Sequence, residues 1–345
     1  MGEVRIGILG SGFMGLTHSE AVSKYLKQAR LVAIAGGSRA PALAARYGVE
    51  AEQSAEALAA RRDIDALIIA TPHAAHAEQA LLAARHQKHI LVEKPMATAL
   101  EDCDAMIDAC RRAGVNLMVG QMQRYRKANA LAKQLIADGR IGNVLMIRES
   151  QIGSGGIASF PAWQNEPANV GVLIGHGIHN FDRLRWLTGS EVTGVSARVS
   201  RWREPANVDL SAMVLLTFAS GAAATFWMTW ECPKPGFAGS EFRSWIMGEK
   251  GLLDIDAYGK LQLGTEAGWE VVFEQPPIDY RGNKLDPVRM QTYVDQDQEF
   301  VDSILQGRRP AVPGEEGRAA VQIALAAYRS NQTGETVHLT PAHGG

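Results

Sequence analysis

A lysine stands where a buried strand would be expected to end. Residues 89–95 read HILVEKP, so Glu93 and Lys94 directly follow an apolar run, and Pro95 closes the segment. A lysine in that position can hydrogen-bond a substrate hydroxyl or carbonyl, stabilise a developing alkoxide and pass a proton, while the glutamate orients or tunes it. A solvated surface ion pair is the alternative interpretation of a Glu-Lys pair.

Three glycines near the N-terminus have the spacing of a phosphate-binding loop. Gly10, Gly12 and Gly15, in GILGSGFMG, follow a β-branched run and open a segment with helical spacing. The first glycine permits a tight turn, the second lets the backbone approach a pyrophosphate, and the third lets helix and strand pack closely. The helix N-terminus offers free N–H groups to the phosphates. The segment predicts a dinucleotide site, with Phe13 and Met14 beside the phosphates.

The end of the second predicted strand distinguishes between two cofactors. An NAD site usually has Asp or Glu there, to accept hydrogen bonds from the ribose hydroxyls. Here LVAIAGGSRA supplies Gly36 and Gly37, followed by Ser38 and Arg39. Serine and arginine can bind a 2′-phosphate that a carboxylate would repel, so we expect NADP rather than NAD. If Arg39 is only a solvated residue at a helix start, the protein uses either cofactor.

Two further strand ends carry polar residues. In a doubly wound sheet, ligands bind outside the carboxyl ends of the strands. The segment ATPHAAH follows an apolar strand, so Thr71 and Pro72 would border the nicotinamide ribose, with His76 also on the cofactor side. The segment VGQMQRYRKA follows the last such strand and brings Gln121 and Arg124 to the same cleft.

The elements that must position these residues follow two patterns. Through about residue 120, short apolar strands alternate with helices, which predicts a doubly wound parallel sheet covered on both faces. Later, alternating runs separated by glycine turns predict a large, mainly antiparallel open sheet, with helices near 171–188, 291–306 and 315–330. We therefore expect an α/β cofactor domain over 1–124 and an α+β domain, for substrate binding and oligomerisation, over 125–345.

Composition excludes several classes of partner. The formal net charge is −2, so no broad attraction to nucleic acid or to an anionic membrane is expected. The cysteines, Cys103, Cys110 and Cys232, form no CxxC pair, which favours a reducing compartment. No run approaches about 18 apolar residues, and the N-terminus lacks a secretory pattern. We expect a cytoplasmic protein with a small-molecule substrate.

Taken together, these segments resemble the glucose–fructose oxidoreductase/inositol dehydrogenase/MocA family, from about residue 3 to residue 340. The matching segments are GILGSGFMG, IDALIIATPHAAH, HILVEKPMA, GVLIGHGIHNFDRLRWLTG and QEFVDSILQGRRPAVPGEEGRAAVQIALAAYRSNQTGETVHL. The resemblance implies a Rossmann domain, an open-sheet domain, and homo-dimers or homo-tetramers that form through that sheet. It also implies that Lys94 and His179 are the catalytic residues and that Gln121 and Arg124 face cofactor and substrate.

The chain departs from the family pattern at one position near the predicted catalytic histidine. The family has Asp four residues before that histidine, whereas this chain has Gly175. His176, His179 and Asp182 are spaced three apart, so on one helix they would line one face and contact the substrate. Three interpretations stay open. His179 acts with Lys94 while His176 contacts the substrate, the substrate requires less assistance, or the chemistry has been lost.

Other aromatic residues and histidines have less specific roles. Trp163, in a loop before the histidine-bearing helix, either stacks on a sugar or nicotinamide or packs in the core. We expect Phe226, Trp227 and Trp230 in the sheet or at a subunit interface. Three HxxH pairs lack a third acidic or thiolate ligand at a fixed spacing, so no metal site is expected; they are His73/His76, His86/His89 and His176/His179.

The sequence thus predicts an NADP(H)-preferring oxidoreductase. It would move a hydride between nicotinamide and a secondary alcohol or ketone of a sugar, cyclitol or related polyol, and NAD remains an alternative cofactor. One alternative function is a dehydrogenase of a cyclic dihydrodiol or an aromatic-derived hydroxy acid. Another, of a different class, is a dinucleotide-binding sensor or regulatory protein without turnover.

Overall fold

The computed structural model describes residues 2–203, 205–237, 242–279 and 282–340, and these form two compact units. The first unit contains the residues up to Tyr125 together with 278–319, and the second contains 126–277 together with the residues from Ala320 on. The units differ from the expected domains, 1–124 and 125–345, because 278–319 pack with the first unit. The assignment of cofactor and substrate binding to separate domains remains a prediction.

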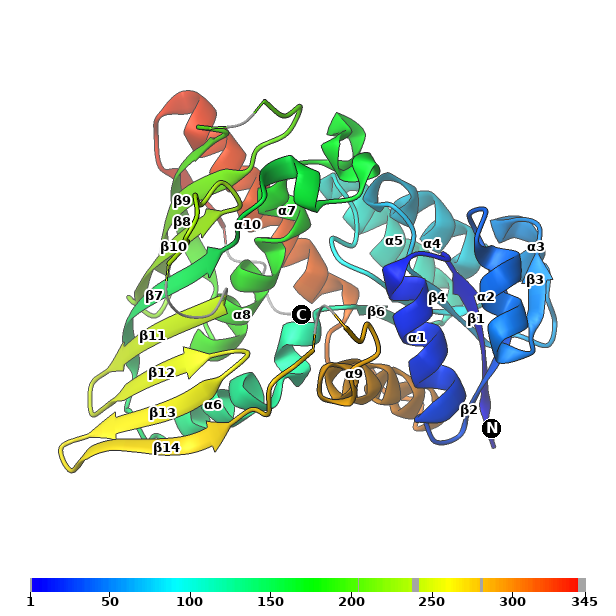
Figure 1. Cartoon of the computed structure of the whole chain (residues 1–345), viewed down its shortest axis with the longest axis horizontal. Helices are drawn as coiled ribbons and strands as arrows, with labels where there is room; N and C mark the ends of the chain where they lie inside the picture. The colour runs from blue at the N-terminus through cyan, green and yellow to red at the C-terminus, as the bar shows by residue number, and fades with distance from the viewer. Residues whose placement is uncertain (1, 204, 238–241, 280–281, 341–345) are drawn as a thin grey trace. The chain divides into compact units, whose positions relative to one another are not determined.

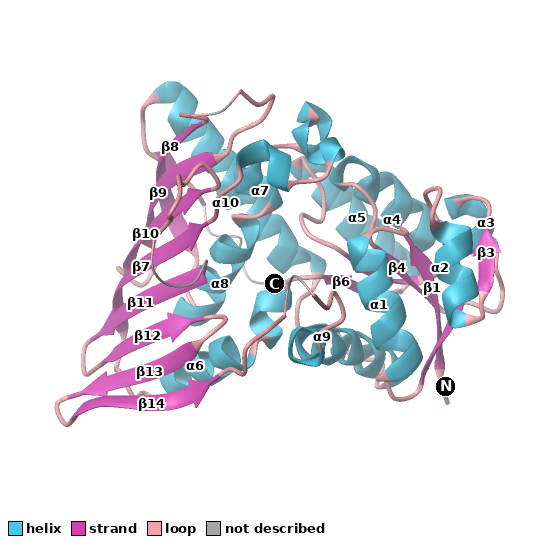
Figure 2. Ribbon diagram, in the orientation of Figure 1, coloured by secondary structure: helices cyan, strands magenta, loops and turns pink. Residues whose placement is uncertain are grey.

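The first unit is built on a six-stranded parallel sheet, as predicted, in the order β3-β2-β1-β4-β5-β6 (Figure 1). Its strands are β1 (Val4–Leu9), β2 (Ala29–Ala35), β3 (Glu50–Glu52), β4 (Ala66–Ile69), β5 (His89–Val92) and β6 (Leu117–Val119). Its helices are α1 (Phe13–Lys24), α2 (Ala40–Tyr47), α3 (Ala55–Ala60), α4 (His76–Arg85), α5 (Leu100–Ala113) and α9 (Pro287–Leu305). Helices α1 and α2 contact β2, whereas α4 contacts β4 and β5. Figure 2 shows the helices and strands of this unit coloured by type.

Strand composition explains why this sheet is covered on both faces. All four residues of β4 are buried and apolar, as are Ile90, Leu91 and Val92 in β5. Continuous apolar strands of this kind are typical of parallel sheets between helical layers. The strand order reverses beside β1, which pairs with β2 on one side and β4 on the other. The carboxyl ends of these strands therefore form the crevice where such folds bind ligands.

The second unit contains a nine-stranded sheet in the order β14-β13-β12-β11-β7-β10-β9-β8-β15. The pairs are antiparallel except for β7 with β10, which confirms the predicted mainly antiparallel sheet. The strands are β7 (Val144–Ile152), β8 (Val192–Ser200), β9 (Ser211–Phe218), β10 (Ala223–Thr229), β11 (Phe242–Gly248), β12 (Leu252–Asp256), β13 (Lys260–Thr265), β14 (Gly268–Glu274) and β15 (Val337–His338). The helices are α6 (Lys127–Ala137), α7 (Val172–Gly175) and α8 (Ile178–Thr188), with α10 (Gly314–Thr333) running from the first unit into the second.

Alternating burial shows that this sheet has one covered face. In β9, Leu216 is fully buried, whereas its neighbour Leu215 is 46% exposed. Helix α6 lies against β12 and β13, and α7 lies against β9 (Figure 1). In the described part of the chain, no helix lies on the opposite face. Nor does any described helix combine the length and apolar character needed to cross a bilayer.

Candidate active site

The turn after β1 can be made only by glycine. Gly10 has φ +124°, and a Cβ atom there would lie 2.3 Å from the Ala70 carbonyl oxygen. A Cβ atom on Gly15 would lie 2.0 Å from the carbonyl oxygen of Gly10, so strand, turn and helix are in direct backbone contact. This is the close packing that the GxGxxG spacing predicts.

The start of α1 suits a phosphate group. Gly12 is the N-cap residue, no described side chain caps it, and the first turn contains no acidic residue. A Cβ atom on Gly12 would approach only a guanidinium nitrogen of Arg39, at 3.6 Å, among the described atoms. The first N–H groups of the helix are therefore available to an anion. Phe13 and Met14 open the helix, and the Arg289 guanidinium lies 4.3 Å from the centroid of the half-exposed Phe13 ring.

The segment after β2 presents no carboxylate. Gly36 and Gly37 both have positive φ, +89° and +80°, and the Ser11 hydroxyl donates a hydrogen bond to the Gly36 carbonyl at 2.7 Å. Ser38 and Arg39 follow as exposed residues before α2. Among the described residues of this segment, no side chain matches the ribose-binding carboxylate that is usual for NAD.

Lys94 follows β5 directly, next to a buried carboxylate. Glu93 is 7% exposed, Lys94 is partly buried, and the Lys94–Pro95 peptide bond is cis. The backbone N–H of Lys94 donates to Oε2 of Glu93 at 3.2 Å. Burial lowers the pKa of the Lys94 ammonium, and the charge of Glu93 opposes that shift. The pKa of Lys94 is therefore moved toward neutral pH, which is the property expected of a proton-transfer group.

A histidine that the sequence interpretation missed holds this glutamate. Nε2 of His18, on α1, lies 3.1 Å from Oε1 of Glu93, and its Nδ1 lies 2.8 Å from Oδ2 of Asp297 on α9. His18 and Asp297 are fully buried. One signal was available in the sequence, because the polar run 17–20 falls in the middle of the predicted helix that packs against the first strand. Asp297 gave no local signal.

In the loop after β4, the predicted cofactor-side residues make hydrogen bonds within the protein. The ring nitrogens of His76 face two carbonyl oxygens, that of Pro95 at 2.8 Å and that of Thr71 at 2.9 Å, so His76 ties the loop after β4 to the loop after β5. Burial lowers the pKa of His76, with the carbonyl groups opposing it. Thr71 also hydrogen-bonds Gln79 through its hydroxyl, and the exposed Pro72 follows it.

The residues predicted after β6 are less open to a ligand. Gln121 is fully buried. The Arg124 guanidinium forms an ion pair with Glu316 at the start of α10, within the first unit. A substrate contact by Arg124 would compete with that ion pair, so the expected role remains a prediction.

In the second unit, the predicted helix over 171–188 is broken, and this corrects the expectation of one shared face. Helix α7 ends at Gly175, and α8 begins at Ile178, with His176 and Gly177 between them. Two glycines lower the helical propensity here, and a Cβ atom on Gly177 would lie 2.6 Å from the Leu173 carbonyl oxygen. His176 is thus not on the helix that carries His179 and Asp182.

His176 instead lies within an aromatic group. Its ring centroid is 4.9 Å from that of Phe160 and 5.1 Å from that of Trp230, and its Nε2 lies 3.2 Å from Oε1 of Gln164. Trp230 was expected in the sheet or at an interface, but it follows β10 and contacts this histidine. Trp163, from the same loop as Gln164, is partly buried. Phe226 and Trp227 lie in β10, as expected.

His179 and Asp182 share one face of α8, but they differ in access. His179 is 8% exposed and Asp182 is fully buried. This burial favours a structural role for Asp182 over the substrate contact predicted from sequence. Lys94 belongs to the first unit and His179 to the second, and their joint action remains a prediction.

The histidine pairs have other partners. Both ring nitrogens of His76 face carbonyl groups, and Nε2 of His86 binds Glu56 at 2.8 Å. Among the described residues, no three His, Cys, Asp or Glu side chains come together as a metal site would require.

Comparisons with known proteins identify both units. The family model "Oxidoreductase family, NAD-binding Rossmann fold" matches residues 4–121, and the model "GFO/IDH/MocA C-terminal domain" matches residues 129–254. An inositol 2-dehydrogenase from Rhizobium meliloti is 30% identical, over 95% of this chain and 96% of its own length. A 2,7-anhydro-N-acetylneuraminate hydratase from Mediterraneibacter gnavus is 27% identical, over 99% of this chain and 98% of its own length.

Solved structures agree with these matches. Levoglucosan dehydrogenase, in complex with NADH and L-sorbose, superposes with a TM-score of 0.86 at 26% identity, covering 99% of this chain and 100% of that one. The resemblance noted in the sequence is therefore confirmed, and the chain belongs to the GFO/IDH/MocA family of oxidoreductases.

Proposed function

We propose that this chain is an NADP(H)-preferring dehydrogenase or reductase of a sugar, cyclitol or related polyol. Family membership makes it an NAD(P)-dependent oxidoreductase that acts on CH–OH groups, and the proposal adds the cofactor preference and the substrate class. One observation carries it. A lysine with a lowered pKa lies beside a buried carboxylate at the carboxyl end of a strand, in an NAD-binding fold.

The chain's own residues would handle the proton of the substrate oxygen. A bound nicotinamide supplies or accepts the hydride. Lys94 donates a proton to the substrate oxygen in reduction and accepts the hydroxyl proton in oxidation, and its charge stabilises the alkoxide between these states. Because burial lowers its pKa, proton transfer near neutral pH costs less than it would from an exposed lysine. His179 assists as an acid/base group or by positioning the substrate.

The preference for NADP is supported by the segment after β2. No carboxylate stands there to repel a 2′-phosphate, and exposed Ser38 and Arg39 can donate hydrogen bonds to one. The backbone adds a second reason. Positive φ at Gly36 and Gly37 disfavours any side chain, so a ribose-binding aspartate at either position would be strained. Levoglucosan dehydrogenase, a relative of known structure, is in complex with NADH, so the preference for NADP requires its own test.

The substrate class is supported by relatives named for inositol and levoglucosan. Gly175 removes the family carboxylate beside the histidines, and His176 is packed with Phe160 and Trp230. This aromatic surrounding favours, as a second candidate, a less polar ring such as a cyclic dihydrodiol or an aromatic-derived hydroxy acid. A sensor without turnover is the outcome expected if no substrate is converted.

The assembly and compartment belong to the same proposal. The open sheet face carries Met146, Met213, Leu215 and Trp269, each at least 46% exposed, which supports a homo-dimer or homo-tetramer through the second unit. The three cysteines are buried and unpaired with one another, which supports a reducing compartment such as the cytoplasm.

A substrate screen with two lysine variants tests the activity. The protein is assayed with NAD, NADP and their reduced forms against polyols, keto-sugars and cyclic dihydrodiols, by absorbance of the reduced nicotinamide. Lys94→Ala is expected to reduce kcat by about 10²–10⁴-fold, the typical contribution of a general acid–base group, with NADPH affinity nearly intact. Lys94→Arg keeps the charge but cannot pass a proton at neutral pH, so it is expected to remain nearly inactive.

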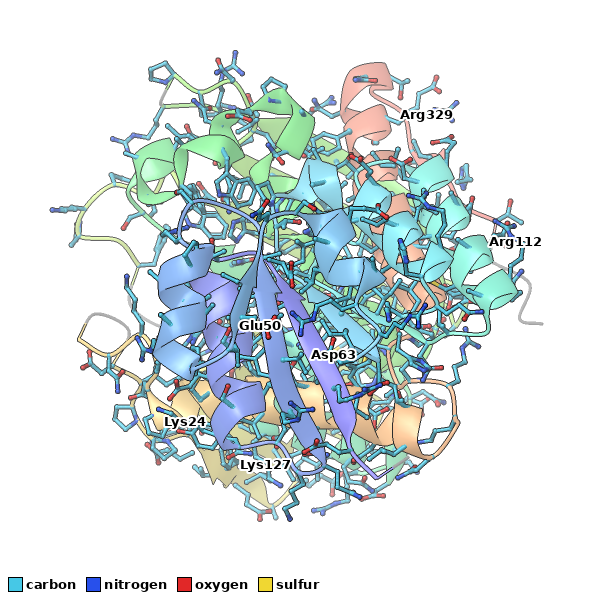
Figure 3. The ribbon with its side chains drawn as sticks, turned by 90° about the vertical axis from the view of Figure 1, so that its right-hand side faces the viewer. Lys24, Glu50, Asp63, Arg112, Lys127 and Arg329 are labelled. Carbon is cyan, nitrogen blue, oxygen red and sulfur yellow. The ribbon has the colours of Figure 1, made fainter. Side chains whose placement is uncertain are left out.

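Lys24→Ala is the matched control. Lys24 is an exposed lysine on α1 that pairs with Glu20, and it is labelled in Figure 3. Activity that survives Lys94→Ala would refute the proposed chemistry. Because one relative is named a hydratase, product analysis should accompany the absorbance assay, and product formed without stoichiometric change in the cofactor would indicate hydration instead.

A further inference from the structure

A buried row of charged groups links α9 to the loop that carries Lys94. Asp297 of α9 contacts His18 of α1, His18 contacts Glu93, and Glu93 accepts the backbone N–H of Lys94. The side chains of Asp297, His18 and Glu93 come from elements far apart in the sequence, yet all three lie in the first unit. Removing charged groups from water costs free energy, so a buried row of them requires an explanation.

Both nitrogens of the His18 ring face carboxylates, and this geometry indicates a cation. A neutral imidazole has one N–H donor, so it can donate to Asp297 or to Glu93 but not to both. The contacts of 2.8 Å and 3.1 Å are hydrogen bonds from both ring nitrogens when the ring is protonated. Burial lowers the pKa of His18, but the charges and hydrogen bonds of Asp297 and Glu93 outweigh it and raise that pKa to about 10.

The groups around His18 are fixed in place by their other contacts. Oδ1 of Asp297 accepts the side-chain amide of Gln296 at 3.2 Å, and the edge of the Tyr293 ring faces the imidazole with centroids 6.1 Å apart. Arg289 of α9 donates to the Thr17 hydroxyl at 3.0 Å, directly beside His18 in the chain. Helix α9 is thus attached to α1 at two adjacent residues.

On the lysine side, the same carboxylate serves two partners. Oε1 of Glu93 binds His18, and Oε2 binds the Lys94 N–H. Although Glu93 is buried, the hydrogen bond and charge of His18 hold its pKa below the usual range. A cationic His18 therefore keeps this carboxylate ionised and oriented beneath the lysine.

We propose that His18 and Asp297 are positioning residues for Lys94. Asp297 keeps the imidazole cationic, and the cation holds the Glu93 carboxylate where it fixes the loop and opposes loss of the lysine's proton. The inference rests on the proposed role of Lys94 as the acid–base group. It adds two fully buried residues, 279 positions apart, that would act through Glu93 and not by contact with a ligand.

The test uses Asp297→Asn, which removes the charge and keeps the shape. Without that carboxylate, burial dominates and His18 becomes neutral within the assayable range, so Glu93 loses its cation as the pH rises. We expect kcat to fall by about tenfold at pH 8 and to recover at lower pH, a transition absent from the unaltered protein. We expect the Kd for NADPH to change by less than about threefold, because no cofactor contact is removed.

His18→Gln, alone and combined with Asp297→Asn, distinguishes a role in positioning Lys94 from a role in packing alone. His18→Gln should lower kcat at every pH without recovery, and Asp297→Asn should add less than about twofold in that background, because both act through one group. Asp295→Asn is the matched control, since its carboxylate lies on the same helix, is exposed, and accepts a hydrogen bond from the Gln291 side chain at 2.7 Å. A loss of melting temperature in either variant, with kcat and its pH profile unchanged, would overturn the proposal.

A measurement without substrate keeps the inference separate from the proposed activity. In the protein with bound NADP, the imidazole ¹⁵N shifts of His18, assigned by the His18→Gln spectrum, should show a cation at pH 8. In Asp297→Asn they should show a neutral ring. A neutral His18 at pH 8 in the unaltered protein would overturn the inference, whereas a failed substrate screen with a cationic His18 would count against the activity alone.

Discussion

Two lysines at opposite ends of one strand have pKa values that burial lowers, but only one of them stands where a ligand is expected. Lys88 precedes β5, and its ammonium donates to the carbonyl oxygens of Arg61 and Ile64 at 2.7 and 2.8 Å. Lys94 follows β5 and adjoins the Glu93 carboxylate. Burial lowers the pKa of both. Position distinguishes them, because only Lys94 stands at the carboxyl end where ligands bind such sheets.

At the residue scale, Arg39 is expected to decide cofactor choice. Arg39→Ala should weaken NADP binding by about 10- to 150-fold, since charge-assisted hydrogen bonds contribute roughly 1.5–3 kcal/mol, and should change NAD binding little. The measurement is the Kd of each cofactor by fluorescence titration. Arg46→Ala, on the same helix α2, is the control. Equal losses for both cofactors would remove the case for a 2′-phosphate site.

The site residues that could be predicted from sequence have local signals. Gly10 and Gly15 have a spacing whose steric reason lies within one turn, and Lys94 stands between an apolar run and Pro95. His18 and Asp297 are 279 positions apart, and neither is unusual among its neighbours except for the buried polar run around His18. Only the folded chain brings the two together.

At the element scale, the glycines between predicted strands were correctly assigned to turns, but two glycines inside a predicted helix were not recognised as a break. Gly175 and Gly177 divide the expected helix over 171–188, which separates His176 from His179. Helix α9 was expected near 291–306 and forms over Pro287–Leu305, but its packing partner α1 could not be read from its own pattern. An amphipathic helix specifies which face is buried, not which element covers it.

The contact between α1 and α9 predicts how stability depends on pH. The pKa of His18 is raised from 6.5 to about 10 in the folded protein. Between these values the folded state binds more protons than the unfolded state, so the stabilisation is full below about pH 6.5 and is lost as the pH rises toward 10. Urea unfolding between pH 6 and pH 10 should show midpoints that fall with pH. Asp297→Asn should flatten that slope, and an equally steep slope in the variant would contradict the assignment.

At the scale of the whole molecule, the open face of the nine-stranded sheet exposes large apolar side chains. Its exposed residues are apolar near the middle, and Arg148 and Arg243 flank the Trp245 ring at 4.8 and 5.0 Å from its centroid. An exposed sheet face of this kind suits a symmetric contact between two copies, because the apolar patch of one copy is then buried against the same patch of the other.

The proposed assembly can be tested by placing charge on that face. Met146→Arg and Leu215→Arg, on neighbouring parts of the sheet, should convert a dimer or tetramer into a smaller species, because each would bury unpaired charge in the contact. Light scattering coupled to size-exclusion chromatography measures the mass. Tyr25→Arg, at an exposed aromatic residue beyond α1, is the control. An unchanged mass in both sheet variants would rule out this face as the interface.

The chain leaves the first unit after residue 125 and returns to it only at 278. During synthesis, the ribosome therefore releases the nucleotide-binding sheet long before it releases Asp297, the carboxylate that pairs with the buried His18 imidazole. Until Asp297 emerges, the contact between His18 and Glu93 lacks its third residue. The first segment to be synthesised therefore completes its buried contacts only after most of the chain has been made.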